Sequence, residues 1–141
     1  MNNHACVTGW GMYVPERVLT NSELEQVVDT SDSWIIERTG IRERRVVADD
    51  ETTSTMAVEA SQRAMEEAGL KAEDLDLIIV ATTSPDNFYP SCACQVQDAL
   101  RAKKAAAFDL GAGCSGFLYA LATATQFIRT GAYRNALVVG S

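Results

Sequence analysis

The sequence has few of the features of a nucleic-acid-binding, membrane or secreted protein. Twelve Lys and Arg residues against 19 Asp and Glu residues give the 141-residue chain a formal net charge of -7, and such a chain is repelled by a phosphate backbone. The longest apolar run, around LDLIIVA, is too short to cross a bilayer. The start, MNNHACVTGWGMYVP, lacks the basic residues and the continuous apolar stretch of a secretory signal. We therefore expect a cytoplasmic protein with no nucleic-acid partner and no membrane segment.

The chain has a single histidine, and the spacing of its four cysteines limits the metal chemistry available. Four cysteines without a secretory signal are expected to be reduced thiols rather than disulfides. Cys92 and Cys94 form a C-x-C pair with no second pair and no histidine nearby, and the single histidine, His4, lies on the N-terminal tail. No metal site is expected from this pattern.

The chain does contain an alternation of helical and strand patterns. Residues 53–68 carry small apolar residues at helical spacing and end at Gly69. The run LDLIIVATT is continuous, apolar and β-branched, which is typical of a parallel strand covered on both faces. The strand patterns AAAFDL and ALVVGS follow, each after a helical segment. This alternation predicts an α/β fold with a largely parallel sheet.

The first third of the chain is less regular. We expect a strand leading into a loop at residues 5–15, a short helix at 21–29, a second helix at 29–41, and a hairpin or edge strand at 41–47. Asn21 or Ser22 would cap the first helix, and Gly40 would end the second.

Cys114 lies in FDLGAGCSGFLYALATATQFI, between a strand pattern and an apolar helix. Ligands gather beyond the carboxyl ends of parallel strands, and Gly113 and Gly116 permit a tight turn there. A helix start favours a thiolate, and its backbone N–H groups could bind the oxyanion formed when that thiolate attacks a thioester. The pattern fits a nucleophile, but also a small buried cysteine. The helix is apolar nearly all round, which predicts burial between layers.

A basic cluster lies in the otherwise acidic N-terminal third. Its members are Arg38, Arg42, Arg44 and Arg45. Together with Trp34, the cluster would suit an anionic, aromatic ligand or an acidic protein surface. The alternative is a solvated hairpin whose arginines pair with Asp49, Asp50 and Glu51. Trp34 considered alone fits a core position.

Three ordered motifs carry a resemblance that extends over nearly the whole chain. TSDSWIIERTGIRERR, ATTSPDNFYPSCACQVQ and AFDLGAGCSGFLYAL resemble β-ketoacyl-acyl carrier protein synthase III. The resemblance implies a thiolase-like, layered αβαβα fold of two similar halves, each with a mostly parallel mixed sheet. Residues 1–141 would form the N-terminal half.

The resemblance also implies roles for individual residues. Cys114 matches the catalytic cysteine that accepts an acyl group. Trp34 matches the tryptophan that stacks on the adenine of coenzyme A, Arg38 matches the arginine that meets the CoA phosphates or the carrier protein, and Thr30 lies on the same segment. Tyr89 falls where relatives often place a phenylalanine that closes the partner subunit's acyl pocket. This departure leaves the preferred acyl group open.

The implied reaction is the initiation of fatty-acid synthesis. An acyl group would pass from acyl-CoA to Cys114 and condense with malonyl-acyl carrier protein, with release of CO2 and CoA. The CoA thioester is then a substrate, and no resident cofactor is implied. The family's catalytic histidine and asparagine have no matching positions here, so we expect a companion C-terminal half and a homodimer of full-length subunits. The alternatives are a related CoA-dependent acyltransferase, a quinolone- or polyketide-type synthase, or a non-catalytic subunit.

Overall fold

The computed structural model describes residues 4–141, which form two units. One unit comprises the residues up to Tyr13 together with 52–141, and the other comprises 14–51. Each unit has its own sheet. The larger unit contains the three strand patterns that were expected in the second half of the chain, and it carries Cys114.

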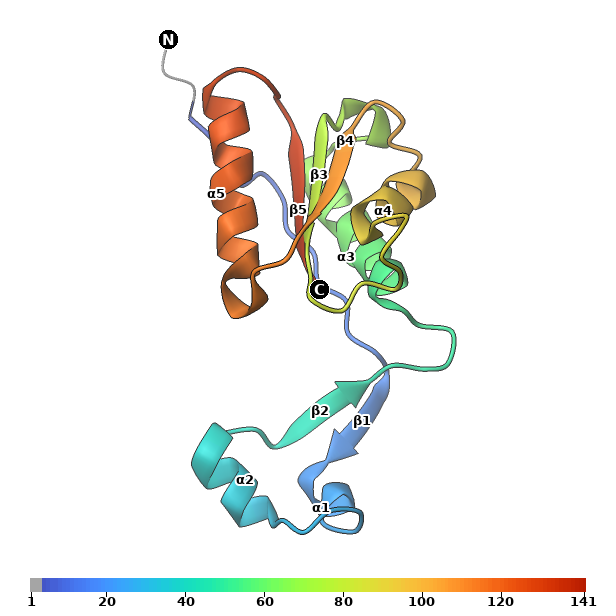
Figure 1. Cartoon of the computed structure of the whole chain (residues 1–141), viewed down its shortest axis with the longest axis vertical. Coiled ribbons are helices and arrows are strands. Elements are labelled where there is room, and N and C mark those ends of the chain that lie inside the picture. Colours follow the sequence, from blue (N-terminus) through green and yellow to red (C-terminus); the bar gives the residue numbers. More distant parts are fainter. Residues whose placement is uncertain (1–3) are drawn as a thin grey trace. The chain divides into compact units, whose positions relative to one another are not determined.

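The sheet of the larger unit is parallel and has the order β4-β3-β5 (Figure 1). Its strands are β3 (Leu77–Ala81), β4 (Ala106–Leu110) and β5 (Ala136–Gly140). Every residue of β3 is buried, as its continuous apolar run predicts. Ala81 pairs with Leu110 on one side and with Gly140 on the other, so all three strands end at the same edge of the sheet.

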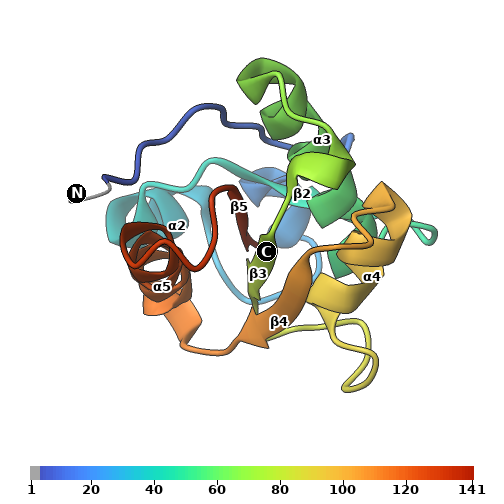
Figure 2. The same cartoon turned by 90° about the horizontal axis from the view of Figure 1, so that it is seen from above.

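Helices cover both faces of this sheet (Figures 1 and 2). They are α3 (Thr53–Ala68), α4 (Cys92–Leu100) and α5 (Gly116–Arg129), with short 3-10 turns η1 (Ala72–Asp74) and η2 (Gly113–Ser115). Alternate residues of β3 point to opposite faces. Ile78 and Val80 therefore pack in the core shared with α3 and α4, while Leu77, Ile79 and Ala81 pack against α5.

The ends of α3 fall where the sequence predicts them. Thr52 and Thr55 form a reciprocal capping box at the start. Gly69 follows the last turn with φ of 65°, a left-handed conformation that favours glycine. Because both signals are local, the expected helix at 53–68 is confirmed residue for residue.

The strand expected at residues 5–15 is wrong. Residues 5–15 form no strand, and this segment lies against α3 at Gly9 and Gly11. A Cβ atom on Gly9 would overlap the carbonyl oxygen of Ala64, and one on Gly11 would overlap that of Ala60. Glycine at these two positions lets the segment approach the helix backbone, and the segment does so without joining the sheet.

The smaller unit contains two antiparallel strands and two short helices. Its elements are β1 (Arg17–Thr20), α1 (Asn21–Leu24), α2 (Asp32–Thr39) and β2 (Glu43–Val46). The edge strand expected near 41–47 is confirmed as β2. Helix α2 begins after its cap, Ser31, three residues later than expected, and it ends at Gly40 with φ of 73°, as predicted.

Helix α1 differs from its prediction. Thr20 is its cap, because the Thr20 side chain accepts a hydrogen bond from the backbone of Glu23 while the Glu23 carboxylate accepts from Thr20. The expected caps, Asn21 and Ser22, are wrong by one and two residues. The helix also ends at Leu24, well short of residue 29.

Candidate functional site

Cys114 lies in the turn that joins β4 to α5. It is the middle residue of η2, and its side chain is exposed. Gly113 precedes it with φ of 53°, so the turn uses a backbone conformation that other residues rarely adopt. The expected strand-to-helix turn at the carboxyl edge of a parallel sheet is confirmed, whereas the alternative of a buried cysteine is wrong for this chain.

The turn occupies two of the backbone N–H groups near the thiol. The N–H of Ser115 donates to the carbonyl of Ala112 at 3.2 Å, and the N–H of Gly116 donates to that of Gly113. Both groups were among the oxyanion donors expected from the sequence. Because they are already used, they are not free to bind an oxyanion in this conformation.

Helix α5 packs closely on the sheet along one face only. A Cβ atom on Gly116 would lie 3.3 Å from the Cβ of Ala81, which shows how near the helix start comes to β3. In the next turn, Phe117, Leu118 and Tyr119 are exposed large side chains. The expectation that the helix is buried all round is therefore wrong within this chain, and an apolar surface lies directly after Cys114.

The loop 82–91 leaves the same sheet edge as the Cys114 turn. It follows β3, whose last residue pairs with the last residue of β4. Near its end, Phe88 is 102% exposed and Tyr89 is 91% exposed. Tyr89, the expected gate of an acyl pocket, therefore lies on an exposed aromatic loop.

Two aspartates that the sequence analysis did not identify hold the chain on either side of Phe88 and Tyr89. Asp86 accepts hydrogen bonds from the backbone and the side chain of Ser54, at the start of α3. Asp109, on β4, accepts from the backbone N–H groups of Cys92 at 2.9 Å and Ala93 at 2.7 Å. No local pattern marks these contacts, because each joins residues at least 16 positions apart in the chain.

The protonation of groups near the loop follows from these contacts. Burial of the Asp86 carboxyl opposes ionisation, but hydrogen bonds from Ser54 and Thr52 outweigh burial and lower its pKa below the usual value. Cys92 is fully buried, and burial together with the charge of Asp109 raises the pKa of its thiol to about 12. Cys92 is therefore an inert core thiol at neutral pH, unlike a nucleophile.

The expected CoA-binding residues lie in the smaller unit. Trp34 and Arg38 are one turn apart on α2, so their side chains share one face of the helix. Trp34 is 56% exposed, so its assignment to the core is wrong for this chain. Thr30 is half-buried just before the helix cap Ser31. The unit thus presents an aromatic face and a guanidinium group side by side.

Two of the four clustered arginines have structural roles. Arg44 donates to the Asn21 side chain at 2.8 Å, and Arg45 donates to the carbonyl of Pro15 at 3.0 Å. Asn21 is buried and also donates to Asp32. These contacts hold the strand pair and the start of α2 together. Arg38 and Arg42, both exposed, are the remaining members of the cluster that could bind an anionic ligand.

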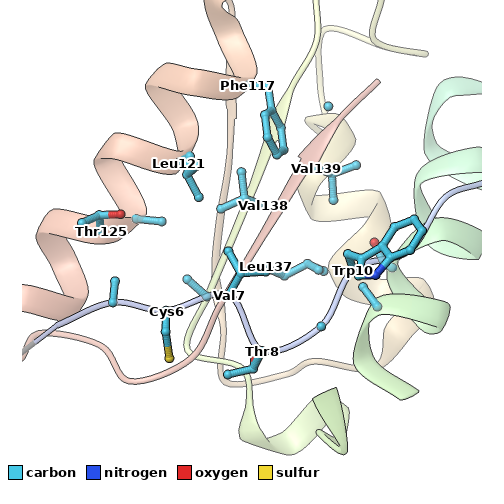
Figure 3. A pocket seen from close by; sticks show the side chains of 18 of the residues that line it. Cys6, Val7, Thr8, Trp10, Phe117, Leu121, Thr125, Leu137, Val138 and Val139 are labelled. Atoms are coloured by element: carbon cyan, nitrogen blue, oxygen red, sulfur yellow. The ribbon is translucent and has the colours of Figure 1, made fainter. Parts of the chain in front are cut away.

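A groove of about 450 Å3 lies beside β5 (Figure 3). Its walls are the N-terminal segment, α3, α5 and the whole of β5; Val7, Phe117, Leu121 and Val138 are among its apolar side chains. Cys114 does not line it. The groove exists because the N-terminal segment passes β5 without pairing with it.

Among residues 4–141, no three His, Cys, Asp or Glu side chains are grouped closely enough to hold a metal ion. No helix in the same range combines the length and the apolar character needed to span a bilayer.

Comparisons with known proteins place these features in a known context. The model of the family described as 3-oxoacyl-[acyl-carrier-protein (ACP)] synthase III matches residues 108–141. The chain is 58% identical over 135 residues to beta-ketoacyl-[acyl-carrier-protein] synthase III 1 of Bacillus anthracis, an alignment that covers 96% of the chain and 44% of that protein.

Solved structures agree over nearly the same region. The 3-oxoacyl-[acyl-carrier-protein] synthase III of Aquifex aeolicus VF5 superposes with a TM-score of 0.92 at 53% identity, over 95% of this chain and 43% of that one. The priming β-ketosynthase of the R1128 polyketide pathway superposes with a TM-score of 0.96 at 38% identity, over 99% and 42%. The chain thus spans less than half the length of these proteins, and the expected fold class is confirmed.

Proposed function

We propose that this chain carries the acyl-accepting half of a β-ketoacyl-[acyl-carrier-protein] synthase III. The premise is its homology to the N-terminal part of that thiolase-like family. Cys114 would attack the carbonyl of an acyl-CoA thioester, and CoA would leave as the acyl group becomes a thioester of Cys114. Condensation with malonyl-acyl carrier protein would follow, with release of CO2.

The observation that carries this proposal is the position of the thiol. Cys114 is exposed at the carboxyl edge of a parallel sheet, on a left-handed glycine turn before a helix. Of the other cysteines, Cys92 is buried with a raised pKa, whereas Cys6 is exposed on an irregular segment. An accessible thiol at a strand-to-helix turn is the geometry that covalent acyl transfer needs.

The proposal assigns the remaining catalytic groups to the part of the protein that the chain does not span. Decarboxylative condensation requires groups that stabilise an enolate and move protons. The chain has one histidine, His4, which is exposed on the N-terminal segment. A companion C-terminal half therefore belongs to the proposal. A homodimer of full-length subunits and a cytoplasmic location belong to it as expectations from the family resemblance.

Trapping the acyl-enzyme tests the proposal directly. The intact protein is incubated with acetyl-CoA without a malonyl donor, digested and mapped by mass spectrometry. We expect an acetyl adduct on the Cys114 peptide of the wild type and of Cys6→Ala, and none on that peptide of Cys114→Ala. An adduct that persists in Cys114→Ala would overturn the assignment, as would wild-type protein that condenses substrates without one.

The CoA-binding role of α2 has its own test in the intact protein. Trp34→Ala and Arg38→Ala should each raise the KM for acyl-CoA by about tenfold, because base stacking and a charge-assisted phosphate contact are each worth on the order of 1–3 kcal/mol. Arg129→Ala, which removes an exposed arginine from α5, serves as the control. An unchanged KM in both α2 variants would return this surface to the solvated-hairpin interpretation.

The similarity to a polyketide priming synthase motivates a second candidate. That structure superposes with the higher of the two TM-scores, 0.96, although its identity to the chain is lower. A synthase that primes another pathway would use the same thiol with a different acyl group. Tyr89, on the exposed loop, is the residue that we expect to influence which acyl group is accepted. Comparing turnover of straight-chain and branched acyl-CoA by the intact protein would separate them.

A further inference from the structure

We propose that Asp86 and Asp109 are positioning residues that fix the loop 82–91 on either side of its aromatic pair and so determine where Phe88 and Tyr89 are presented. The inference rests on the proposed function, in which Tyr89 contributes to an acyl pocket. It adds two side chains that contact neither substrate nor thiol but control acyl-chain selectivity through the loop.

The first half of the loop is tied to the start of α3. The Asp86 carboxylate accepts from the Ser54 backbone N–H at 3.1 Å and from the Ser54 hydroxyl. The Thr53 hydroxyl donates to the carbonyl of Ser84 at 2.7 Å. Ser54 is buried, so its two bonds to Asp86 are partly shielded from competing water, whereas the Thr53–Ser84 bond is exposed. The loop is therefore fastened before it reaches its aromatic residues.

The far end of the loop is tied to β4. Each oxygen of Asp109 accepts one backbone N–H from the first turn of α4, from Cys92 and Ala93. The Ser91 hydroxyl accepts the N–H of Cys94 at 3.3 Å and completes the cap. A carboxylate at a helix start is favoured by the exposed amides there. Since Asp109 precedes Leu110 and the Cys114 turn, one strand supports both the thiol and the end of the loop.

The aromatic residues lie between these two anchors. Phe88 and Tyr89 are almost completely exposed, so their packing within this chain does not fix the loop. A flexible loop would lose entropy each time the aromatic pair entered a pocket, and an anchored loop avoids that loss. The contacts that decide where Tyr89 lies are therefore the polar ones on either side of the aromatic pair.

The main test measures acyl-chain selectivity of the intact protein. In Asp109→Asn an amide donor faces a backbone donor, and in Asp86→Asn the bonds from Ser54 lose their charge. We expect the ratio of kcat/KM for acetyl-CoA to that for isobutyryl-CoA to change by about threefold to tenfold, which is the size of the net contribution of one ordinary hydrogen bond. The rate of Cys114 alkylation should stay at the wild-type value. Asp98→Asn, on the exposed side of α4, is the matched control.

A second measurement does not depend on activity. Hydrogen exchange of peptides covering residues 82–93 should speed up in both variants and stay unchanged in Asp98→Asn. Ser54→Ala removes the hydroxyl bonds to Asp86 and Thr52 but keeps the backbone N–H bond to Asp86. It should give a smaller change in the same direction, and it replaces Asp86→Asn if that variant does not fold.

The outcomes separate this inference from the proposed function. Faster exchange together with altered selectivity supports the positioning role. Unchanged exchange overturns it, and faster exchange with wild-type selectivity also overturns it, because the loop would then be anchored without affecting the acyl pocket. If wild-type protein forms no acyl-enzyme, the proposed function fails, whereas the exchange experiment still decides whether the two carboxylates hold the loop.

Discussion

The four cysteines of the chain differ in environment, and this difference decides which of them can react. Cys114 and Cys6 are exposed, Cys94 is half-buried and Cys92 is buried. Only thiolates attack, so a raised pKa suppresses reactivity even for a thiol that a reagent can reach. The buried Cys92 thiol therefore does not compete with Cys114 for an acyl group at neutral pH.

The rates of iodoacetamide labelling in the intact protein should reflect the exposure of each thiol and the activation proposed for Cys114. We expect Cys114 to be labelled first and Cys92 last. With a pKa of about 12, Cys92 has a thiolate fraction on the order of 10^-4 at pH 8, and this fraction rises about tenfold per pH unit until the pKa is reached. Mass mapping after brief labelling at pH 7, 8 and 9 measures all four rates. Equal rates at Cys6 and Cys114 would contradict an activated nucleophile, and fast labelling of Cys92 at pH 7 would contradict its burial.

At the residue level, sequence and structure agree where a signal is local. The place of Cys114 followed from a strand, a glycine pair and an apolar helix that are contiguous in the chain. Asp109 gave no such signal, because an aspartate inside a strand pattern acquires its role only when α4 is packed beside β4. Likewise, the sequence could not show that Arg44 and Arg45 are used internally, since their partners lie more than 20 residues away.

At the level of elements, the Cys114 turn depends on one glycine more than on its neighbours. Gly113 has φ of 53° with no atom near its missing side chain, whereas Gly111 has no positive φ and its nearest contact would be 3.9 Å away. The two glycines therefore differ in backbone conformation rather than in available space.

Gly113→Ala should accordingly lower the free energy of unfolding by about 1 kcal/mol, the cost of a left-handed conformation for a residue with a Cβ. It should also reduce acyl transfer by displacing the thiol. Gly111→Ala is the control and should leave both quantities near the wild type. Chemical denaturation and the acyl-enzyme assay measure the two effects in the intact protein. Equal effects of the two substitutions would show that the turn does not depend on its left-handed residue.

The elements themselves were predictable to different degrees. Helix α3 and strand β3 have capping residues and apolar patterns that decide their ends without help from the rest of the chain. Strand β1 was missed because its four residues carry no strong pattern and are ordered by pairing with β2, more than 20 residues later. The strand expected at residues 5–15 failed for the opposite reason. Its pattern suits a strand, but its glycines pack against a helix instead.

At the scale of the whole molecule, the larger unit leaves a strand edge and an apolar helix surface uncovered by the residues that the structure describes. The outer edge of β5 pairs with no described residue, and the first turns of α5 expose Phe117, Leu118 and Tyr119. Open strand edges and contiguous apolar surface both promote association. Such surfaces are expected where the chain spans less than half the length of its relatives.

The isolated 141-residue chain should therefore associate or aggregate rather than behave as a monomer. Size-exclusion chromatography with light scattering measures the mass. Leu118→Glu should shift the distribution toward monomer, while Gln126→Glu adds the same charge at an exposed position on the same helix and should have little effect. A monodisperse, cooperatively unfolding monomer would contradict the half-molecule interpretation.

The contact between the N-terminal segment and α3 also requires a defined spacing between Gly9 and Gly11. From Gly9 to Gly11 the extended backbone advances about 6.6 Å, and from Ala64 to Ala60 the helix advances about 6 Å in the opposite direction. Two residues of one match four residues of the other, so both glycines meet equivalent carbonyls at once. Inserting a single residue between them would break this match at one glycine or the other. The rise of α3 per residue therefore sets the register of the N-terminal segment along the helix, and this register requires no strand pairing.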